Sequence, residues 1–236
     1  MDDRYARADL SKRLDPALLE QFASIPTTVI SDALVGFGIA AHVVRDVRRV
    51  SGSSSSTLVG SAVTIRYAPI DAPHPPHEAP YLASRIIERA SPRDVLVLAA
   101  AGAPYAFWGD HMTSHAQRRS VAMAVVDGGA RDISRIRALD FPLYARGTTP
   151  ETLLPHFEAV AYNEAVTCGG VEVEPGDVIA ADEDGVVVVP LEIAAAVLET
   201  ARARRELEEE AETSGDVEDP FAVYDRIYRD GWAKGS

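Results

Sequence analysis

Residues 109–132 read GDHMTSHAQRRSVAMAVVDGGARD, and this stretch decides the fold. Within it, Val121–Val126 form a run of small, β-branched and other apolar residues without a charge. Such a run suits a strand buried on both faces, although periodicity alone does not separate it from a short buried helix. The preceding segment, His111–Arg119, is compatible with a helix. The stretch therefore predicts a helix followed by a buried strand.

The two ends of this stretch are expected to converge. The strand should stop at a glycine turn, Asp127-Gly128-Gly129, because two glycines permit positive φ angles and let backbone N–H groups approach an anion. Arg131 and Asp132 would then lie at the carboxyl end of the strand, where ligands bind in α/β sheets. Gly109-Asp110 precede the helix, whose first N–H groups would face an anion.

The charged groups at these two ends complement one another chemically. The guanidinium of Arg131 can grip a carboxylate with two parallel hydrogen bonds. Asp132 offers a hard oxygen ligand for Mg²⁺ or Mn²⁺, and Asp110 could act directly or through a water, since Mg²⁺ keeps several waters in proteins. An Arg-Asp pair after a turn is also common as a surface salt bridge, so chemistry alone leaves both interpretations open.

Composition restricts the class of protein. The 236 residues suffice for one large or two small domains, and the net charge of -13 argues against nucleic-acid binding without excluding an anionic substrate. The single cysteine, Cys168, excludes an intrachain disulfide and fits a reducing cytoplasm. The first twenty residues are charged throughout, and no apolar run is long enough to span a membrane. We therefore expect a cytoplasmic protein with no membrane partner.

Asp110 and Arg131 are separated by twenty residues, and this D-x20-R-D pattern resembles the signature of the RraA-like family. Further blocks resemble those of the family in the same order: Ser31–Leu34, Val59–Ala62, Val125–Gly128, Pro142–Gly147, Val173–Asp177 and Asp182–Pro190. The family includes the class II 4-hydroxy-4-methyl-2-oxoglutarate / 4-carboxy-4-hydroxy-2-oxoadipate aldolases, which also decarboxylate oxaloacetate. The similarity runs from about Pro26 to the C-terminal helix.

The resemblance implies a fold and an assembly. The fold would be the swivelling β/β/α topology of the RraA-like family, a single α/β domain with a long C-terminal helix. Residues 1–25 would form an N-terminal helical extension, residues 26–212 the RraA-like domain, and residues 213–236 a tail with a short helix. The assembly would be a homotrimer or a homohexamer of two stacked trimers.

The resemblance also implies a divalent-metal-dependent lyase whose substrate is a small 2-oxo acid. Such an enzyme cleaves a C–C bond of a 4-hydroxy-2-oxo acid to release pyruvate, and it decarboxylates oxaloacetate through the same pyruvate enolate. Asp132 would hold Mg²⁺ or Mn²⁺, helped by Asp110 through a water. Arg131 would bind substrate and stabilise the enolate, because its positive charge would lie where negative charge develops in the reaction.

Further site residues follow from the resemblance. Gly109, His111 and Met112 are expected to bind substrate, and in the family the backbone N–H groups at the last two positions hold a carboxylate. The aldolase relatives lend a glutamate from the long C-terminal helix to the neighbouring subunit's site. Glu206 matches that glutamate best, and Glu209 nearly as well. The base that takes the C4 hydroxyl proton is left open between Asp110 and Glu206.

Three other functions compete with the lyase. The name-giving members of the family bind and inhibit the endoribonuclease RNase E, so a non-catalytic regulator is the alternative. The complete D-x20-R-D pattern favours an enzyme, because a protein that only recognises a partner through its surface needs no inward-facing metal ligand. His111 and His115 have the i, i+4 spacing of zinc metalloproteases, but Met112 stands where the glutamate base belongs. A methyltransferase is disfavoured because no glycine-rich S-adenosylmethionine loop follows a predicted strand.

The other segments predict local structure. Thr27 or Ser31 is expected to cap a helix over Thr27–Leu34 with Asp32 in its first turn, although Asp32 could instead reach a site. His74, His77 and Glu78 could bind a metal, but the prolines around them favour an irregular loop. The remaining predicted helices are one ending near Pro26 and the segments Tyr81–Ala90, Ile133–Asp140, Leu191–Glu212 and Phe221–Arg229. The predicted strands are Thr57–Tyr67, Val95–Ala101 and Phe141–Ala145, with Val166–Val173 and Val186–Val189 in a second β layer. Between them we expect a turn, Arg146–Pro150, and a loop, Gly102–Gly109, whose Phe107 and Trp108 line a pocket or fill the core.

Overall fold

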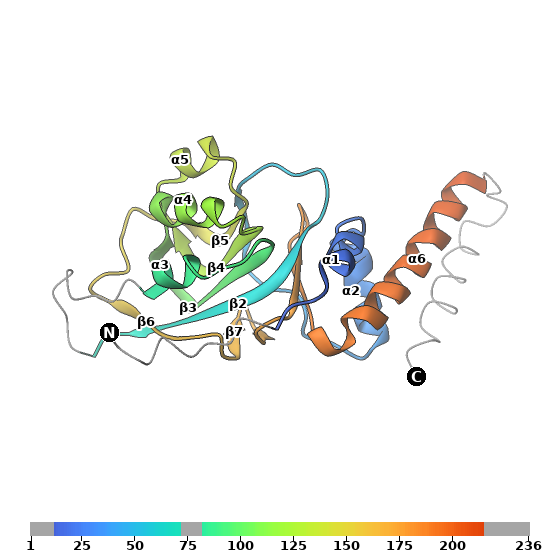
Figure 1. Ribbon diagram of the computed structural model, residues 1–236, viewed down its shortest axis with the longest axis horizontal. Helices are drawn as coiled ribbons and strands as arrows, with labels where there is room; N and C mark the ends of the chain where they lie inside the picture. The colour runs from blue at the N-terminus through green and yellow to red at the C-terminus, as the bar shows by residue number, and fades with distance from the viewer. Residues whose placement is uncertain (1–11, 72–81, 215–236) are drawn as a thin grey trace.

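The computed structural model describes residues 12–71 and 82–214 of the chain (Figure 1). Its main sheet has eight strands in the order β1-β5-β4-β3-β2-β9-β10, with β6 paired to β2. The four strands β2 to β5 are parallel, and the other pairings are antiparallel. The strands are β1 (Arg48–Ser51), β2 (Leu58–Pro69), β3 (Asp94–Trp108), β4 (Met123–Ala130), β5 (Leu143–Thr148), β6 (Phe157–Tyr162), β9 (Val178–Ala181) and β10 (Val186–Val189). The sheet is nearly closed, like a barrel.

Helices connect the parallel strands and cover one face of the sheet. Figure 1 shows α3 (Leu82–Ile87), α4 (Asp110–Arg118) and α5 (Ile133–Ala138) together on that face. The opposite face is covered by a two-stranded hairpin of β7 (Val166–Cys168) and β8 (Val171–Val173). Sequence therefore predicts correctly that the central strands are buried on both sides.

Alternation along β3 shows how one strand serves two cores. Leu96 and Leu98 pack in the cluster beneath α3, α4 and α5, whereas Val95 and Val97 pack in the cluster beneath the β7–β8 hairpin. All four side chains are essentially inaccessible to solvent. A fully buried aliphatic side chain of this size contributes about 1.5–3 kcal/mol, so both layers hold the strand in place.

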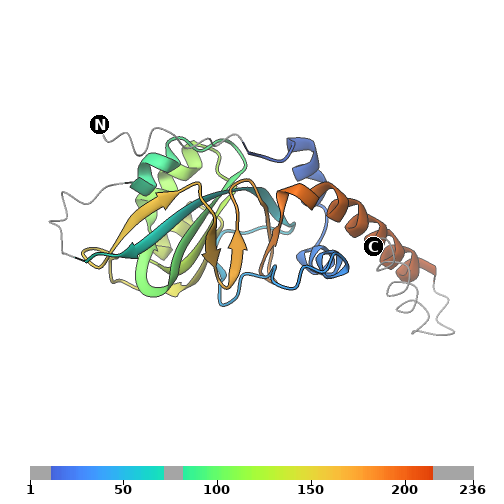
Figure 2. The ribbon, with the colours of Figure 1, turned by 90° about the horizontal axis from the view of Figure 1, so that it is seen from below.

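A third core lies at the other end of the sheet. There α1 (Pro16–Phe22), α2 (Thr27–Gly36) and α6 (Ala194–Ser214) pack with β9 and β10, and a short 3-10 turn (Leu191–Ile193) leads into α6. Figures 1 and 2 both show α6 extending away from the sheet. The expected N-terminal and long C-terminal helices are thus present as α1 and α6, and the predicted α/β domain with a long C-terminal helix is confirmed.

The predicted glycine turn is wrong. Gly128 and Gly129 lie inside β4, which continues to Ala130, and neither has a positive φ. They are required for space instead: a Cβ on Gly128 would lie 2.6 Å from a ring carbon of Phe107, and one on Gly129 would lie 2.9 Å from the carbonyl oxygen of Tyr105. Glycine here lets β3 and β4 approach closely, and the site lies beyond the strand end.

The predicted loop Gly102–Gly109 is also wrong. β3 continues to Trp108, because its later residues still pair with β4 through an irregular register. Likewise β5 runs on to Thr148, through most of the predicted turn Arg146–Pro150. Propensity failed at these places because the neighbouring strand supplies hydrogen bonds that local sequence does not reveal.

The predicted second β layer differs in its members. Val166–Val173 is not one strand: Gly169 and Gly170 have positive φ and turn it into the β7–β8 hairpin. Val186–Val189 belongs to the main sheet, where it pairs with β9. Neither β6 nor β9 was predicted. Short strands of this kind are specified by their partners more than by their own residues.

The predicted helix caps are wrong as well. Pro26 occupies the N-cap of α2, and the Thr27 hydroxyl donates to Asp182 at 2.7 Å instead. Ser31 hydrogen-bonds His42 at 2.7 Å, and Asp32 forms an ion pair with Arg204 of α6. These polar side chains hold segments that are distant in sequence.

Some predictions lie outside the described residues: the start of the N-terminal extension, the His74 and His77 loop, and the helix Phe221–Arg229. Within residues 12–71 and 82–214, none of the helices combines the length and apolar character needed to cross a membrane.

Candidate functional site

Two adjacent parallel strands bring the ends of the D-x20-R-D stretch together. Trp108, the last residue of β3, is paired with Ala130, the last residue of β4. The backbone N–H of Arg131 then donates to the Trp108 carbonyl at 3.0 Å, which extends the pairing by one residue. Asp110 and Asp132 therefore leave the sheet at the same edge, the carboxyl end of the strands, as predicted.

Asp132 has the most constrained geometry of the group. Its backbone is left-handed, with φ 60° and ψ 29°, at the N-cap of α5. Its Oδ2 lies 3.4 Å from the backbone nitrogen of Asp110 and 3.6 Å from Nε of Arg131. A left-handed non-glycine residue costs about 1–3 kcal/mol and is found where the surrounding structure enforces it, although Asp tolerates it better than most residues. The carboxylate is thereby directed at the start of α4.

Gly109 makes room for that carboxylate. A Cβ at this position would lie 2.9 Å from Asp132 Oδ2, closer than ordinary van der Waals contact. The backbone of Gly109 is extended, with φ -154° and ψ -176°, so the glycine is needed for space and not for its conformation. A residue that was predicted to bind substrate thus has a structural reason to be glycine.

Asp110 has a partner that sequence reasoning missed. Its Oδ2 forms an ion pair with Nε of Arg135 at 3.0 Å, and its side chain is only 16% exposed. Arg135 belongs to α5 and its side chain is 73% exposed. In the sequence, the only indication that Arg135 could approach Asp110 was its position in a predicted helix, three residues after Asp132. Two arginines and two aspartates therefore face each other across the site.

The N-terminus of α4 supplies backbone donors. The Thr113 N–H donates to the Gly109 carbonyl at 3.1 Å and so closes the first helical turn. The N–H groups of His111 and Met112, which precede it, are therefore outside the i to i-4 ladder of the helix. They point from a helix end that carries partial positive charge, which favours an anion such as a carboxylate.

These groups form one end of a cavity of about 300 Å³. Its wall is largely apolar and comes from β2, α3, β3, the segment that leads into β6, and β6 itself. The lining side chains include Tyr67, Ala83, Ala106, Phe107, Trp108, Leu153, Leu154, Phe157 and Ala159, with Ser84, Thr152 and Glu158 as polar members. Phe107 and Trp108, whose role the sequence left open, do both: each is 1% exposed and each lines the cavity.

Aromatic contacts keep this wall rigid. Phe107 makes edge contacts with Tyr67 and Phe157 at centroid distances of 4.9 and 5.4 Å. Trp108 stacks on Phe141 at 5.7 Å and donates its indole N–H to Thr113 at 2.8 Å. Burial raises the pKa of the Tyr67 phenol, which therefore stays protonated and neutral at physiological pH.

The donor set suits a hard divalent ion that keeps much of its water. Asp132 and Asp110 provide carboxylate oxygens on the same edge of the sheet. Among the described residues no group of three or more acidic, histidine or cysteine side chains is arranged to hold a metal. Mg²⁺ usually takes only one or two protein carboxylates and fills its remaining positions with water and substrate. The two aspartates therefore fit Mg²⁺ or Mn²⁺ better than an ion that needs a full protein cage.

Glu206 is not brought to this site within one chain. It is an exposed residue of α6 and lines a separate hollow beside Leu18 and Gln21 of α1. Figure 1 places α6 at the opposite end of the molecule from α4 and α5. Glu209, the second candidate, pairs with Arg205 at 2.7 Å. A contribution of either glutamate from a neighbouring subunit stays a prediction.

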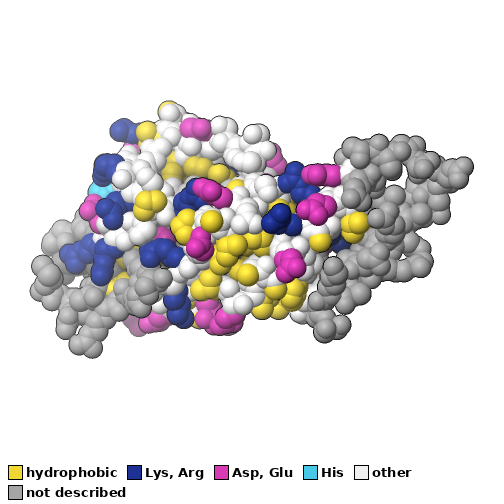
Figure 3. Space-filling model, turned by 45° about the vertical axis from the view of Figure 1, so that its right-hand side comes forward, with side chains coloured by type: hydrophobic (Ala, Val, Ile, Leu, Met, Phe, Trp, Pro, Cys, Tyr) yellow, Lys and Arg dark blue, Asp and Glu magenta, His cyan; other side chains and the backbone are white. Residues whose placement is uncertain are grey.

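Some hydrophobic surface is available for such an assembly. Figure 3 shows hydrophobic side chains gathered in the lower part of one face, with acidic side chains among and around them. In the described part of the chain, the large hydrophobic side chains that remain exposed are Val35, Val43 and Val160. The homotrimer or homohexamer stays a prediction.

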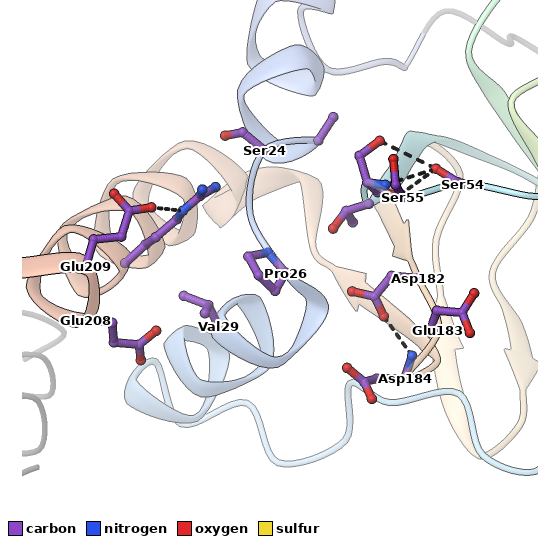
Figure 4. A pocket seen from close by; sticks show the side chains of 14 residues that line it. Ser24, Pro26, Val29, Ser54, Ser55, Asp182, Glu183, Asp184, Glu208 and Glu209 are labelled. Atoms are coloured by element: carbon purple, nitrogen blue, oxygen red, sulfur yellow. Dashed lines mark hydrogen bonds and ion pairs between the residues drawn. The ribbon is translucent and has the colours of Figure 1, made fainter. Parts of the chain in front are cut away.

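A second cavity, of about 670 Å³, is built differently (Figure 4). It lies between α1, α2, α6 and the turn before β10, and its wall is rich in carboxylates. Several of these already have partners: Asp182 accepts from the Thr27 backbone at 2.9 Å and from the Asp184 backbone at 3.0 Å. The hydrogen bonds of Asp182 thus hold the start of α2 against the turn before β10. None of the D-x20-R-D residues is among the residues that line this cavity.

Two other notable groups also lie away from the candidate site. Asp127, buried within β4, pairs with Arg146 of β5, and this hydrogen bond raises the pKa of the guanidinium. Burial raises the pKa of the Cys168 thiol. The thiolate is the nucleophilic form, so Cys168 is an inert core residue.

The chain forms an α/β fold with a small cavity at the carboxyl ends of parallel strands, beside Arg131, Asp132 and the N-terminus of α4. The chain belongs to the RraA-like family, since the family model described as Aldolase/RraA matches residues 27–188. Both the predicted family and the predicted fold are therefore confirmed.

Individual relatives fall into differently named groups. The "Putative 4-hydroxy-4-methyl-2-oxoglutarate aldolase" of Halalkalibacterium halodurans is 34% identical over 192 residues, which cover 79% of this chain and 83% of the relative. Streptomyces coelicolor RraAS2, described as an unusual member of the RNase ES inhibitor RraA protein family, superposes with a TM-score of 0.76 at 28% identity, covering 85% of this chain and 98% of that one. An uncharacterised protein of Pseudomonas syringae pv. tomato gives 0.75 at 28% identity, with 87% and 96% covered.

Proposed function

We propose that this protein is a divalent-metal-dependent lyase that cleaves the C3–C4 bond of a 4-hydroxy-2-oxo acid and releases pyruvate. The observation that carries the proposal is the convergence of Arg131, Asp132 and the N-terminus of α4 at one end of a partly open cavity. The similarity to a protein named as a 4-hydroxy-4-methyl-2-oxoglutarate aldolase supports the same reaction class. Oxaloacetate decarboxylation would use the same site.

Asp132 would hold the Mg²⁺ or Mn²⁺ ion, and Asp110 would assist through a water. When bound, the ion would supply Lewis-acid polarisation of the substrate's keto oxygen. Arg135 would keep the Asp110 carboxylate oriented through their 3.0 Å ion pair. The left-handed backbone of Asp132 and the absence of a side chain on Gly109 would fix the position of the other carboxylate.

The chain's own groups would then bind and orient the substrate. The substrate carboxylate would accept hydrogen bonds from the backbone N–H groups of His111 and Met112 at the start of α4. Arg131 would lie beside the keto oxygen, where negative charge develops. The apolar wall around Phe107 would exclude water from the reacting carbons, which strengthens every charge interaction at this end of the cavity.

The C3–C4 bond would break in a retro-aldol reaction. A base takes the proton of the C4 hydroxyl, C4 becomes a carbonyl, and the electron pair of the C3–C4 bond moves into the pyruvate enolate. Arg131 stabilises that enolate until C3 takes up a proton. The base is Asp110, or Glu206 from a neighbouring subunit of the homotrimer or homohexamer. In oxaloacetate, CO₂ departs in place of the C4 carbonyl fragment and the same enolate remains.

A second candidate is a regulator that binds a protein partner without catalysis. It is favoured by the likeness to RraAS2, whose description places it in an RNase ES inhibitor family. A regulator of this kind would act through its surface. It would not require Arg131 and Asp132 at the mouth of the cavity.

The deciding experiment measures pyruvate release from oxaloacetate and from 4-hydroxy-4-methyl-2-oxoglutarate, with Mg²⁺ or Mn²⁺ and with EDTA. We expect release above the metal-only background in wild type and its loss in Asp132→Ala. Arg131→Lys keeps the charge but loses the two-pronged geometry, so its turnover should fall about 10²–10³-fold without unfolding. Near-wild-type turnover of Arg131→Lys would remove the role of Arg131, and no release by folded, metal-loaded wild type would favour the regulator.

A further inference from the structure

The ion pair between Asp110 and Arg135 lies at the boundary of the cavity. Asp110 lines the cavity and its side chain is 16% exposed, whereas Arg135 is not a lining residue and its side chain is 73% exposed. The guanidinium therefore reaches Asp110 from the solvent side, with Nε 3.0 Å from Oδ2. One oxygen of the carboxylate is thus held by a cation, and Oδ1 is left for a water or a ligand.

The helix that carries Arg135 also positions Asp132. Asp132 is the N-cap of α5, and the backbone N–H of Arg135 donates to the Asp132 carbonyl at 3.0 Å. From this cap the Asp132 carboxylate reaches the start of α4, where its Oδ2 lies 3.4 Å from the backbone nitrogen of Asp110. The position of Arg135 beside Asp110 is therefore determined by the same turn that carries the proposed metal ligand.

The site contains two positive and two negative side chains. Arg131 Nε lies 3.6 Å from Asp132 Oδ2, and Arg135 Nε lies 3.0 Å from Asp110 Oδ2, so each carboxylate has an arginine beside it. The formal charges of these four groups cancel. The two carboxylates attract a divalent ion, and the two guanidiniums oppose it. The proposed reaction uses Arg131 at the keto oxygen, whereas Arg135 acts only through Asp110.

The charge of Arg135 is sufficient to change the affinity for a divalent ion. Even at the dielectric constant of water, about 80, a divalent ion and a positive charge about 6 Å apart repel each other enough to lower affinity about tenfold. Partners of metal ligands commonly alter metal affinity by orienting the ligand. Here the partner is itself a cation, while the backbone of Asp132 orients the other carboxylate. Repulsion should therefore outweigh orientation when the guanidinium is removed.

We propose that Arg135 is a positioning residue that keeps Asp110 out of direct contact with the metal and holds the affinity of the site for Mg²⁺ or Mn²⁺ low. This inference rests on the proposed function for the presence of a metal, and it adds the residue that controls metal binding. In wild type Asp132 is the protein ligand, and Asp110 acts through a water because its Oδ2 is bound to Arg135. Without the Arg135 charge, Asp110 is released and the ion meets one positive charge fewer.

The test measures metal binding directly, without substrate or turnover. Mn²⁺ is titrated into the full chain at low ionic strength, and the free ion is followed by electron paramagnetic resonance. Asp132→Ala defines the binding that belongs to this site, since a chain with a net charge of -13 also attracts cations elsewhere. We expect Arg135→Gln to bind Mn²⁺ about tenfold more tightly than wild type. An equal or weaker affinity would overturn the inference, and so would a wild type that binds no Mn²⁺ through Asp132.

Two further variants separate charge from structure. Arg135→Lys keeps the positive charge and should stay close to the wild-type affinity. Arg137→Gln is the matched control, because it removes a charge from the same helix, but the Arg137 guanidinium donates to the Val50 carbonyl at 3.1 Å instead of to a site carboxylate. It should leave the Mn²⁺ affinity unchanged. A gain in either variant equal to that in Arg135→Gln would contradict the assignment. Exposed ion pairs add little stability, so all three variants should fold, which a thermal melt checks.

Salt gives an independent check on the cause. Because the Arg135 side chain is mostly exposed, its repulsion of the ion should be screened in 1 M KCl, where the Debye length is about 3 Å. The affinity ratio between Arg135→Gln and wild type should then fall from about tenfold toward unity. A ratio that stays the same in high salt would show that a rearranged site causes the gain, and it would overturn the inference.

Pyruvate release separates this inference from the lyase itself. Tighter Mn²⁺ binding by Arg135→Gln, with no pyruvate from oxaloacetate or 4-hydroxy-4-methyl-2-oxoglutarate in metal-loaded wild type, would support the inference and remove the lyase. Metal-dependent pyruvate release with equal Mn²⁺ affinities in the two proteins would overturn the inference and leave the lyase standing. With both correct, the Mn²⁺ concentration for half-maximal rate should be lower in Arg135→Gln than in wild type.

Discussion

Replacement of Gly109 by alanine isolates the role of one carboxylate. The new Cβ would lie 2.9 Å from Asp132 Oδ2, so the carboxylate must move by about 0.5 Å to restore an ordinary contact of 3.4 Å. The backbone itself is extended and accepts alanine without strain. Because displacements approaching 1 Å at a reacting group cost up to about 100-fold in rate, we expect kcat/KM to fall about 10–100-fold.

Stability should change little in the same variant. Gly109 is the N-cap of α4, where alanine is less favourable than glycine by up to about 1 kcal/mol. For a chain of this length that lowers the melting temperature by about 2–4 °C. Gly147→Ala is the matched control, since its added Cβ meets nothing within 4 Å and its φ is not positive; it should retain wild-type activity.

The assay is pyruvate release from oxaloacetate as a function of Mg²⁺ concentration, beside a thermal melt. We expect Gly109→Ala to need more Mg²⁺ for half-maximal rate, while Gly147→Ala follows wild type. A Gly109→Ala enzyme with unchanged kcat/KM and unchanged Mg²⁺ dependence would refute the reasoning, because the displaced carboxylate would then have no part in the reaction.

Two predictions concern stability and pH. Asp94 is fully buried and accepts two hydrogen bonds from Arg13, at 2.7 and 2.9 Å, so Asp94→Ala should lower the free energy of unfolding, measured in urea, by about 3 kcal/mol. Glu20→Ala, the control, breaks an exposed ion pair with Arg93 and should cost at most about 1 kcal/mol. Similar losses in both variants would contradict this prediction. Desolvation raises the pKa of the Asp177 carboxyl group. The folded state therefore binds a proton at Asp177 more readily than the unfolded state does, and the contribution of this group to stability falls as the pH rises from its ordinary pKa to the raised one. The unfolding free energy of Asp177→Asn relative to that of wild type should therefore increase across that interval and level off above it. A constant difference between about pH 3 and 7 would show that Asp177 is not the group responsible.

Sequence patterns predicted the elements that carry a strong local signal. The uncharged run before Asp127 indicates a strand buried on both faces, and β4 is such a strand. The parallel order of β3 and β4 then places Asp110 and Asp132 at one edge, so the spacing along the chain was enough to predict their convergence. These features were predictable because burial and side-chain period leave a direct record in neighbouring residues.

Other features depend on residues that are remote in sequence. Gly128 and Gly129 suggest a turn locally, but their neighbours Phe107 and Tyr105 make them spacers within a strand. The ion pair between Arg135 and Asp110 likewise arises only when α4 and α5 begin side by side.

The sequence by itself therefore predicted the family, the central strands and the convergence of Asp110, Arg131 and Asp132 at one edge of the sheet. Only the tertiary structure decided why Gly109 lacks a side chain, which arginine holds Asp110, and that the cavity beyond Arg131 is apolar. The physical reason is that period and composition report the burial of each residue in its own element. Close contacts and the lining of a cavity are properties of pairs of elements, and they exist only after the elements have packed.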